Sequence, residues 1–149
     1  MLTKLNFTIF IEASPEKVWH SLWDIENYKQ WTSVFSEGSY YEVDNFTEGN
    51  KIHLLTPKGD GMYSILEKII VNKQLSFKHI GDIIDFKEVP VNAAESVENW
   101  SGAYETYTLN AKNGGTELSV SVDTLDKYID FMNSTFPKAL SALKEIAEL

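Results

Sequence analysis

The sequence contains no cysteine, so it cannot form a disulfide framework, a thiolate metal site or a cysteine nucleophile. It also lacks any apolar run that approaches the roughly 20 residues of a transmembrane helix. Residues 1–11 alternate apolar and polar side chains, which differs from the continuous apolar core of a secretory signal peptide. These absences predict a cytoplasmic protein in a reducing compartment, without a membrane-spanning segment.

Basic residues are few. The chain has 13 lysine and arginine residues against 22 aspartate and glutamate residues, which gives a formal net charge of −9. The basic residues are scattered singly, and an acidic surface of this kind repels phosphate backbones and anionic lipid heads. We therefore expect neither a nucleic-acid partner nor a membrane partner.

Common catalytic and nucleotide-binding motifs are also missing: the sequence has no Gly-x-Ser-x-Gly elbow, P-loop or Gly-x-Gly-x-x-Gly fingerprint. His20, His53 and His79 show no metal-ligand spacing. We expect no metal, no cofactor and no dedicated catalytic residue. Because His53 and His79 fall in strand-like stretches, hydrogen-bonded or partly exposed structural histidines are favoured over proton transfer.

The length of 149 residues predicts a single domain, residues 1–149, which would bury roughly 68–70% of the surface of its unfolded chain. Residues 4–11 have the alternation of a half-buried strand. Ser14-Pro15-Glu16 then supplies an N-cap, a proline at the first helical position and a carboxylate in the positive first turn. A helix is predicted to begin there, and a second short helix to cover residues 24–30.

The middle of the chain is strand-like and contains short loops rich in glycine and asparagine, which favour an antiparallel meander. The expected strands are residues 40–43, 51–56, 62–71, 75–80, 101–111 and 117–123. In the expected strand 62–71, apolar residues occur at both odd and even positions. The sequence therefore does not decide which of Leu66, Glu67 and Lys68 points inward.

Two segments differ from this pattern. Residues 81–99 are long, acidic and weakly patterned, and we expect a functional or mobile loop. Residues 125–149 keep helical apolar spacing, and a continuous helix would span roughly 35 Å, enough to cross the sheet. Pro137 is expected to kink this helix or to begin its second segment.

Several short stretches carry a family resemblance along essentially the whole chain. They are residues 11–19 (IEASPEKVW), 28–31 (YKQW), 38–39 (GS), 75–77 (LSF), 100–105 (WSGAYE) and 115–118 (GTEL). With the predicted order of elements, they resemble the START-like (SRPBCC, helix-grip) superfamily, in the branch named after the activator of the heat-shock-protein-ninety ATPase. This resemblance implies an α+β helix-grip fold of order β-α-α-β6-α, in which a curved antiparallel sheet wraps around the long C-terminal helix.

The resemblance also implies an apolar cavity between the sheet and the last helix, so we expect the chain to bind an apolar or aromatic small molecule. Aromatic residues make up 13% of the sequence, and tyrosines with polar tips are suited to orienting a ligand in an apolar pocket. The candidate ligand-binding residues are Trp31, Phe35, Tyr63, Phe77, His79, Tyr104, Glu105, Tyr107, Met132 and Phe136.

Two other functions are open. In a polyketide cyclase or aromatase, Glu105, His79 and Tyr107 would act as acids and bases on an enolisable substrate. In a stress-related interaction module, the acidic surface and residues 81–99 would contact a partner such as a chaperone. The eukaryotic co-chaperone carries an additional N-terminal domain that this sequence lacks, which disfavours the chaperone contact. We expect a monomer or a weak dimer.

Glu105 is expected at an inward-facing position of its strand. Strand parity places Glu105 on the side of Ala103, Tyr107 and Leu109, where a carboxylate is costly unless it is paired or protonated. The alternatives are a bulge that turns it outward, or a lysine or tyrosine that satisfies it.

We expect residues 81–99 to gate one end of the cavity, with a loop packed permanently on the sheet as the alternative.

Overall fold

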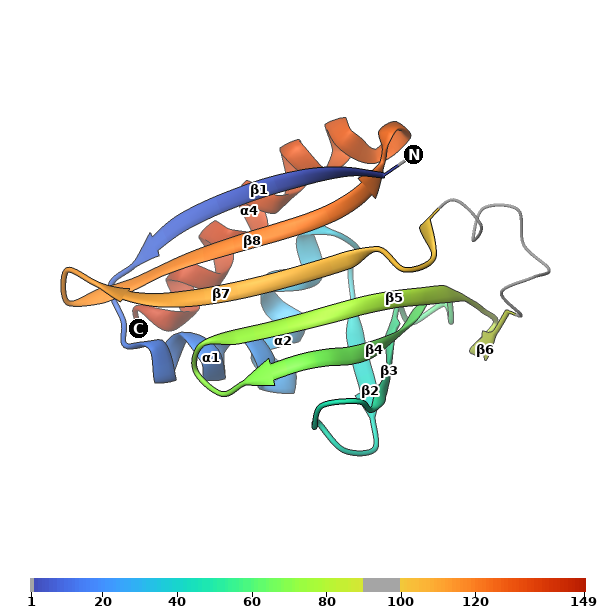
Figure 1. Cartoon of the computed structure of the whole chain (residues 1–149), viewed down its shortest axis with the longest axis horizontal. Coiled ribbons are helices and arrows are strands. Elements are labelled where there is room, and N and C mark those ends of the chain that lie inside the picture. The colour runs from blue at the N-terminus through green and yellow to red at the C-terminus, as the bar shows by residue number, and fades with distance from the viewer. Residues whose placement is uncertain (1, 90–99) are drawn as a thin grey trace.

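The protein is described by a computed structural model, which covers residues 2–89 and 100–149. One antiparallel sheet runs in the order β1-β8-β7-β5-β4-β3-β2, with a two-residue strand β6 paired to β5 (Figure 1). Its strands are β1 Leu2–Ile11, β2 Tyr40–Val43, β3 Lys51–Leu55, β4 Gly61–Ile70, β5 Gln74–Ile84, β6 Lys87–Glu88, β7 Tyr104–Lys112 and β8 Gly115–Leu125.

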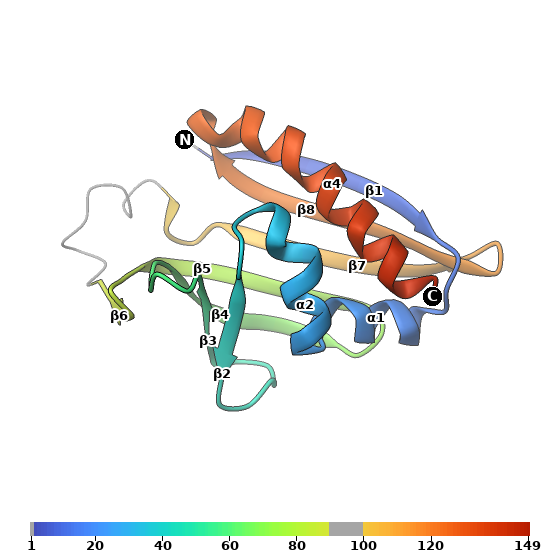
Figure 2. The ribbon, with the colours of Figure 1, turned by 180° about the vertical axis from the view of Figure 1, so that it is seen from behind.

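Within residues 2–89 and 100–149, the helices α1, α2 and α4 cover one face of this sheet and leave the other face open, as the two opposite views show (Figures 1 and 2). They are α1 Pro15–Trp23, α2 Ile25–Trp31 and α4 Ile129–Ala147, with the short 3-10 turns η1 Thr32–Val34 and η3 Asp126–Tyr128. Helix α4 packs along β1 and against α1 and α2. The fold is therefore α+β, with the long C-terminal helix held against the sheet, as the sequence predicted.

Local signals explain where α1 and α2 begin. The Ser14 side chain accepts a hydrogen bond from the Lys17 backbone N–H, and Asp24 does the same for Asn27. These caps satisfy backbone donors that a helix start leaves unpaired. The indole N–H of Trp31 donates to the Leu22 carbonyl at 3.0 Å, so a buried hydrogen bond fixes the angle between the two helices.

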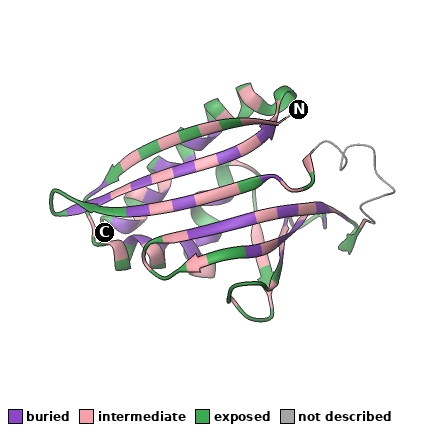
Figure 3. Cartoon of the chain, viewed as in Figure 1, coloured by how far each residue is buried: buried purple, intermediate pink, exposed green. Residues whose placement is uncertain are grey.

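The core lies between the helices and the inner face of the sheet. Along β8, buried residues alternate with less buried ones, which is the expected period of a strand covered on one face (Figure 3). Leu118, Val120 and Val122 are the buried apolar members, and Leu140 and Leu143 face them from the apolar side of α4. The burial of apolar side chains from both the sheet and α4 holds this helix on the sheet.

The segment 81–99 differs from the predicted loop. Strand β5 continues to Ile84, and Ile83 and Ile84 pair with Glu88 and Lys87 of β6. Ile83 is buried, and it forms a small second core with Leu55 and Tyr63, which explains why the chain remains in the sheet here. The prediction that all of 81–99 is a loop is therefore wrong for residues 81–84 and 87–88. Residues 90–99, where most of the expected gate falls, lie outside the described residues.

Three other boundaries are corrected. Helix α4 begins at Ile129 and not at 125, because Leu125 still pairs with Leu2 in the sheet and η3 follows. Pro137 lies exposed inside the same helix, so no second helical segment begins there. Strand β7 begins at Tyr104 and not at 101: Gly102 takes a φ of 90° and donates its N–H to the His79 carbonyl.

The open question on β4 is also settled. Leu66 is buried, whereas Glu67 and Lys68 are both exposed. The register of β4 against β5 shifts between Leu66 and Lys68, so the two charged residues can lie outside in succession. A bulge of this kind breaks the alternation on which a parity argument depends.

Candidate functional site

A cavity of about 250 Å³ lies on the helix-covered face of the sheet. Its walls come from α1, α2 and η1, from strands β3, β4, β5 and β7, and from the first turns of α4. The lining is mostly apolar, and its volume is slightly below the roughly 300–1,000 Å³ of most small-molecule sites. The cavity therefore suits a compact molecule.

Aromatic rings form the buried part of the wall. The Trp23 ring meets the Tyr107 ring at 5.0 Å and the Phe77 ring at 5.6 Å, both nearly perpendicular. Trp31 meets Trp23 at 6.3 Å in the same manner. Edge-to-face contacts of this kind hold ring planes in fixed positions. The inner wall is thus built from rings that also belong to the main core.

The other side of the lining is more exposed. Phe131 has 46% of its surface exposed, and Met62 and Thr56 are partly exposed. Phe35 and Phe136 lie between this side and the core, with their ring centroids 4.8 Å apart. The gradient of exposure places the entrance of the cavity beside Phe131, at the N-terminal end of α4.

Glu105 supplies the charged group of the described lining. The Tyr107 hydroxyl donates to its Oε2, and His79 Nε2 lies 3.1 Å from its Oε1. His79 Nδ1 lies 2.7 Å from the Ser64 hydroxyl, so a neutral ring that donates from Nε2 and accepts at Nδ1 satisfies both contacts. Three strands thereby carry one hydrogen-bonded chain from Ser64 to the cavity.

The arrangement of Glu105 answers the question left by strand parity. Its side chain faces the cavity, retains only 20% exposure and is satisfied by a tyrosine and a histidine. A bulge that turns it outward is not present. Burial raises the pKa of Tyr107 well above its ordinary value, and the nearby charge of Glu105 raises it further. The Tyr107 hydroxyl therefore remains a protonated donor.

One polar atom of the wall has no partner. Trp23 is only 6% exposed, and its indole N–H is buried. This N–H makes no hydrogen bond within residues 2–89 and 100–149. Leaving a buried donor unsatisfied costs about 1–3 kcal/mol. Trp31, in the same wall, differs because its N–H already donates to Leu22. The Trp23 ring lines the cavity, whereas its Nε1 has almost no accessible surface.

Seven of the ten predicted site residues line this cavity and are brought together from β5, β7, α2, α4 and the segment after η1. They are Trp31, Phe35, Phe77, Glu105, Tyr107, Met132 and Phe136. The sequence reasoning did not select Trp23 and Tyr28, which also line it. Trp23 had a usable signal, because helical spacing places it on the same side of α1 as Val18 and Leu22.

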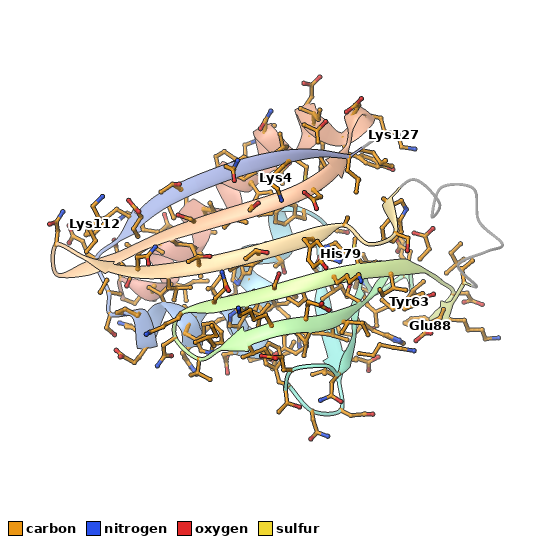
Figure 4. The ribbon with its side chains drawn as sticks, viewed as in Figure 1. Lys4, Tyr63, His79, Glu88, Lys112 and Lys127 are labelled. Carbon is orange, nitrogen blue, oxygen red and sulfur yellow. The ribbon has the colours of Figure 1, made fainter. Side chains whose placement is uncertain are left out.

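The other three predicted residues do not line the cavity. His79 is buried one layer behind Glu105. Tyr63 lies toward the β6 end of the sheet, near Glu88 (Figure 4). There it packs where Gly81 has no side chain, since a Cβ on Gly81 would lie 2.7 Å from the Tyr63 ring. Tyr104 is 37% exposed, because it alternates with the inward Glu105.

The histidines in strands are hydrogen-bonded, as predicted. His79 contacts Ser64 and Glu105, and His53 Nε2 lies 2.8 Å from Glu88 Oε2. Within the described residues, no three His, Asp or Glu side chains gather as a metal site. No helix of the described residues is both long and apolar enough to cross a membrane.

Comparisons with known proteins support the fold. No protein-family model matches the sequence, and the curated proteins give no match. The Aha1 dimer from Colwellia psychrerythraea is 23% identical, with a TM-score of 0.70 over 99% of this chain and 97% of that chain. The AHSA1-like protein from Aeromonas hydrophila is 16% identical, with a TM-score of 0.68 over 98% and 92%.

A third solved structure is DynU16, from the dynemicin biosynthetic locus. It is 12% identical, with a TM-score of 0.67, and the match covers 95% of this chain and 46% of that chain. At these identities the likenesses show the fold. They confirm the predicted helix-grip fold and the predicted resemblance to Aha1-like structures.

Proposed function

We propose that the chain binds one compact apolar or aromatic molecule in the cavity beside Trp23 and Tyr107. The observation that carries this proposal is an apolar cavity walled by buried aromatic rings, with Glu105 as the charged group of its described lining. Apolar lining with a small number of placed polar groups is the usual composition of a small-molecule site. A ligand with an apolar body and a hydrogen-bond donor would fill the cavity and bind Glu105.

The size of the cavity limits the ligand. A volume of about 250 Å³ favours a molecule of one or two rings over a long-chain lipid. The three-carbon phenyl alcohol 3-phenylpropan-1-ol is a suitable probe, since it has an aromatic body and one hydroxyl that can donate to Glu105. Isothermal titration calorimetry should give saturable binding with one site per chain. Absence of saturable binding for this probe and for 2-naphthol would overturn the proposal.

A pair of variants separates the cavity from the rest of the surface. Met132 lines the cavity near its entrance, and Met132→Trp adds bulk there. Ser134→Trp places the same side chain at an exposed position of the same helix. We expect Met132→Trp to weaken binding at least about tenfold, because the probe and the new ring compete for one volume, and Ser134→Trp to leave it unchanged. Equal effects would place the binding elsewhere.

A second candidate function is acid–base catalysis on an enolisable ketone, as in a cyclase. It is favoured by the hydrogen-bonded chain from Ser64 through His79 to Glu105, which ends in the cavity. The Glu105 carboxylate would take an α-proton to give an enolate and then return a proton from solvent. Deuterium exchange at the α-carbon of 2-tetralone in D₂O tests this. Exchange accelerated by the wild type and lost in Glu105→Gln supports catalysis, and equal exchange with and without protein refutes it.

A further inference from the structure

The described lining of the cavity contains one negative group and no cationic side chain. Among its described lining residues, Glu105 is the one charged side chain, and no lysine, arginine or histidine is among them. The donors that Glu105 receives from the protein are the Tyr107 hydroxyl and His79 Nε2, one on each carboxylate oxygen. Of these two donors, the tyrosine hydroxyl is uncharged, and His79 lies behind Glu105 outside the described lining. An anionic ligand would meet repulsion here and no counter-charge.

The Glu105 carboxylate can also accept further hydrogen bonds from a ligand. A carboxylate offers about four lone-pair positions, and the two protein donors occupy one on each oxygen. Because Tyr107 and His79 hold the carboxylate from the β7 and β5 strands, its direction is fixed before a ligand arrives. A donor from a ligand would then form a charge-assisted hydrogen bond, which is stronger than a neutral one.

The surrounding aromatic rings also favour a positively charged ligand. Phe77 is the direct cross-strand partner of Glu105, and Trp31, Trp23 and Tyr107 complete the ring wall. The faces of these rings carry negative charge density, and they attract a cation that lies within about 6 Å of the ring centre. A carboxylate together with several aromatic faces is the combination that stabilises an ammonium group.

We infer that the preferred ligand is an amine, an aromatic or apolar molecule whose ammonium or other cationic donor head binds Glu105 while its body lies among the rings. This inference rests on the proposed function, since it concerns the same cavity. It also makes a negative statement: carboxylic acids of matched size, fatty acids included, are poor ligands.

Three probes with one body test the inference: 3-phenylpropylamine, 3-phenylpropan-1-ol and 3-phenylpropanoic acid. At neutral pH they present a cation, a neutral hydroxyl and an anion on the same chain. Calorimetry on the wild type should give the amine an affinity at least about fivefold above the alcohol, with the acid below both, as a charge-assisted contact implies. This comparison needs no variant and therefore cannot fail through misfolding.

Variants then locate the preference. Glu105→Gln keeps an acceptor for Tyr107 but removes the charge, and it should bring the amine and the alcohol to within about twofold of each other. Because the whole protein is acidic, with a net charge of −9, the control is Glu145→Gln, which removes an exposed charge from α4 outside the cavity. This control should retain the amine preference. A thermal melt of each variant verifies that it is folded.

The outcomes separate the two proposals. If the alcohol binds at one site but the amine has no advantage, or the acid binds as well as the amine, the inference is overturned and the proposed function stands. An amine preference that Glu145→Gln removes and Glu105→Gln leaves intact also overturns it, since the attraction would then come from the surface. If none of the three probes binds, the proposed function itself fails.

Discussion

His79 Nε2 lies 3.1 Å from Glu105 Oε1, between the neighbouring strands β5 and β7. The contact matters because only Glu105 reaches the cavity, while His79 is buried behind it against Ser64. One of the two side chains that hold this cavity carboxylate, His79, is thus outside the described lining. Such support holds a binding group in one direction before a ligand arrives.

The buried tyrosines should resist ionisation. Burial, and then the charge of Glu105, raises the pKa of both Tyr28 and Tyr107. A group whose folded pKa is raised contributes stability that is complete below its unfolded pKa, about 10, and is lost as the pH rises toward the folded pKa. We therefore expect alkaline unfolding to accompany the ionisation of these two hydroxyls. In an ultraviolet titration, Tyr107→Phe should leave the reversible tyrosinate step of the folded protein unchanged. A smaller reversible step in this variant would contradict the raised pKa.

The packing of α4 on the sheet gives a stability prediction. Leu140 is buried in the main core, and neighbouring Ser141 is exposed. Leu140→Ala should lower the free energy of unfolding by about 2–5 kcal/mol, since it removes buried methyl groups and leaves a cavity. Ser141→Ala, the matched control, should change it by less than about 0.5 kcal/mol. Urea unfolding measures both, and equal midpoints would mean that Leu140 does not pack as described.

The partly exposed residue Glu88 should give a pH dependence of stability opposite in sign to that of the buried tyrosines. Burial acts to raise the pKa of Glu88, but hydrogen bonds from His53 and Lys51 lower it more, and the net pKa is below its usual value. The stability from this group is therefore present above the unfolded pKa and is lost as the pH falls through the folded one. Lys51→Met should raise the Glu88 pKa, measured by carboxyl carbon NMR.

The control for that measurement is Lys112→Met, because Lys112 pairs with Glu117 at 3.0 Å and lies at the end of the sheet opposite Glu88 (Figure 4). It should leave the Glu88 pKa where it is in the wild type. If both lysine variants move this pKa equally, the shift arises from net charge rather than from the local ion pair.

The order of elements was predictable because each depends on local patterns. Ser14 and Asp24 cap the helices that they were expected to begin, and alternation identified β1 and β8. Residues 81–84 have no strand-like alternation of their own, and they extend β5 because residues 81–83 pair with residues 61–63 of β4 and residues 83–84 pair with β6. Long-range pairing, and not local propensity, decides such positions.

The cavity was predictable where regular periods hold. Glu105 and Tyr107 face inward as parity required, and the same parity, applied to Tyr104, would have placed it outside. Tyr63 could not be placed in this way, since the β4–β5 register shifts between Tyr63 and Ser64. The unpaired Trp23 N–H depends on the positions of all neighbouring acceptors, and no sequence pattern records those.

The Trp23 indole N–H provides the most direct test of the binding site. In ¹⁵N-labelled protein, the four tryptophans give separate indole signals, and Trp23→Phe assigns the relevant one. On titration with 3-phenylpropan-1-ol, the account predicts a saturable shift of the Trp23 N–H, because the Trp23 ring lines the cavity. The Trp100 N–H, whose residue is not part of the described lining, should shift less. A Trp23 signal that stays fixed while calorimetry reports saturated binding, or four signals that drift together without saturation, would contradict the account.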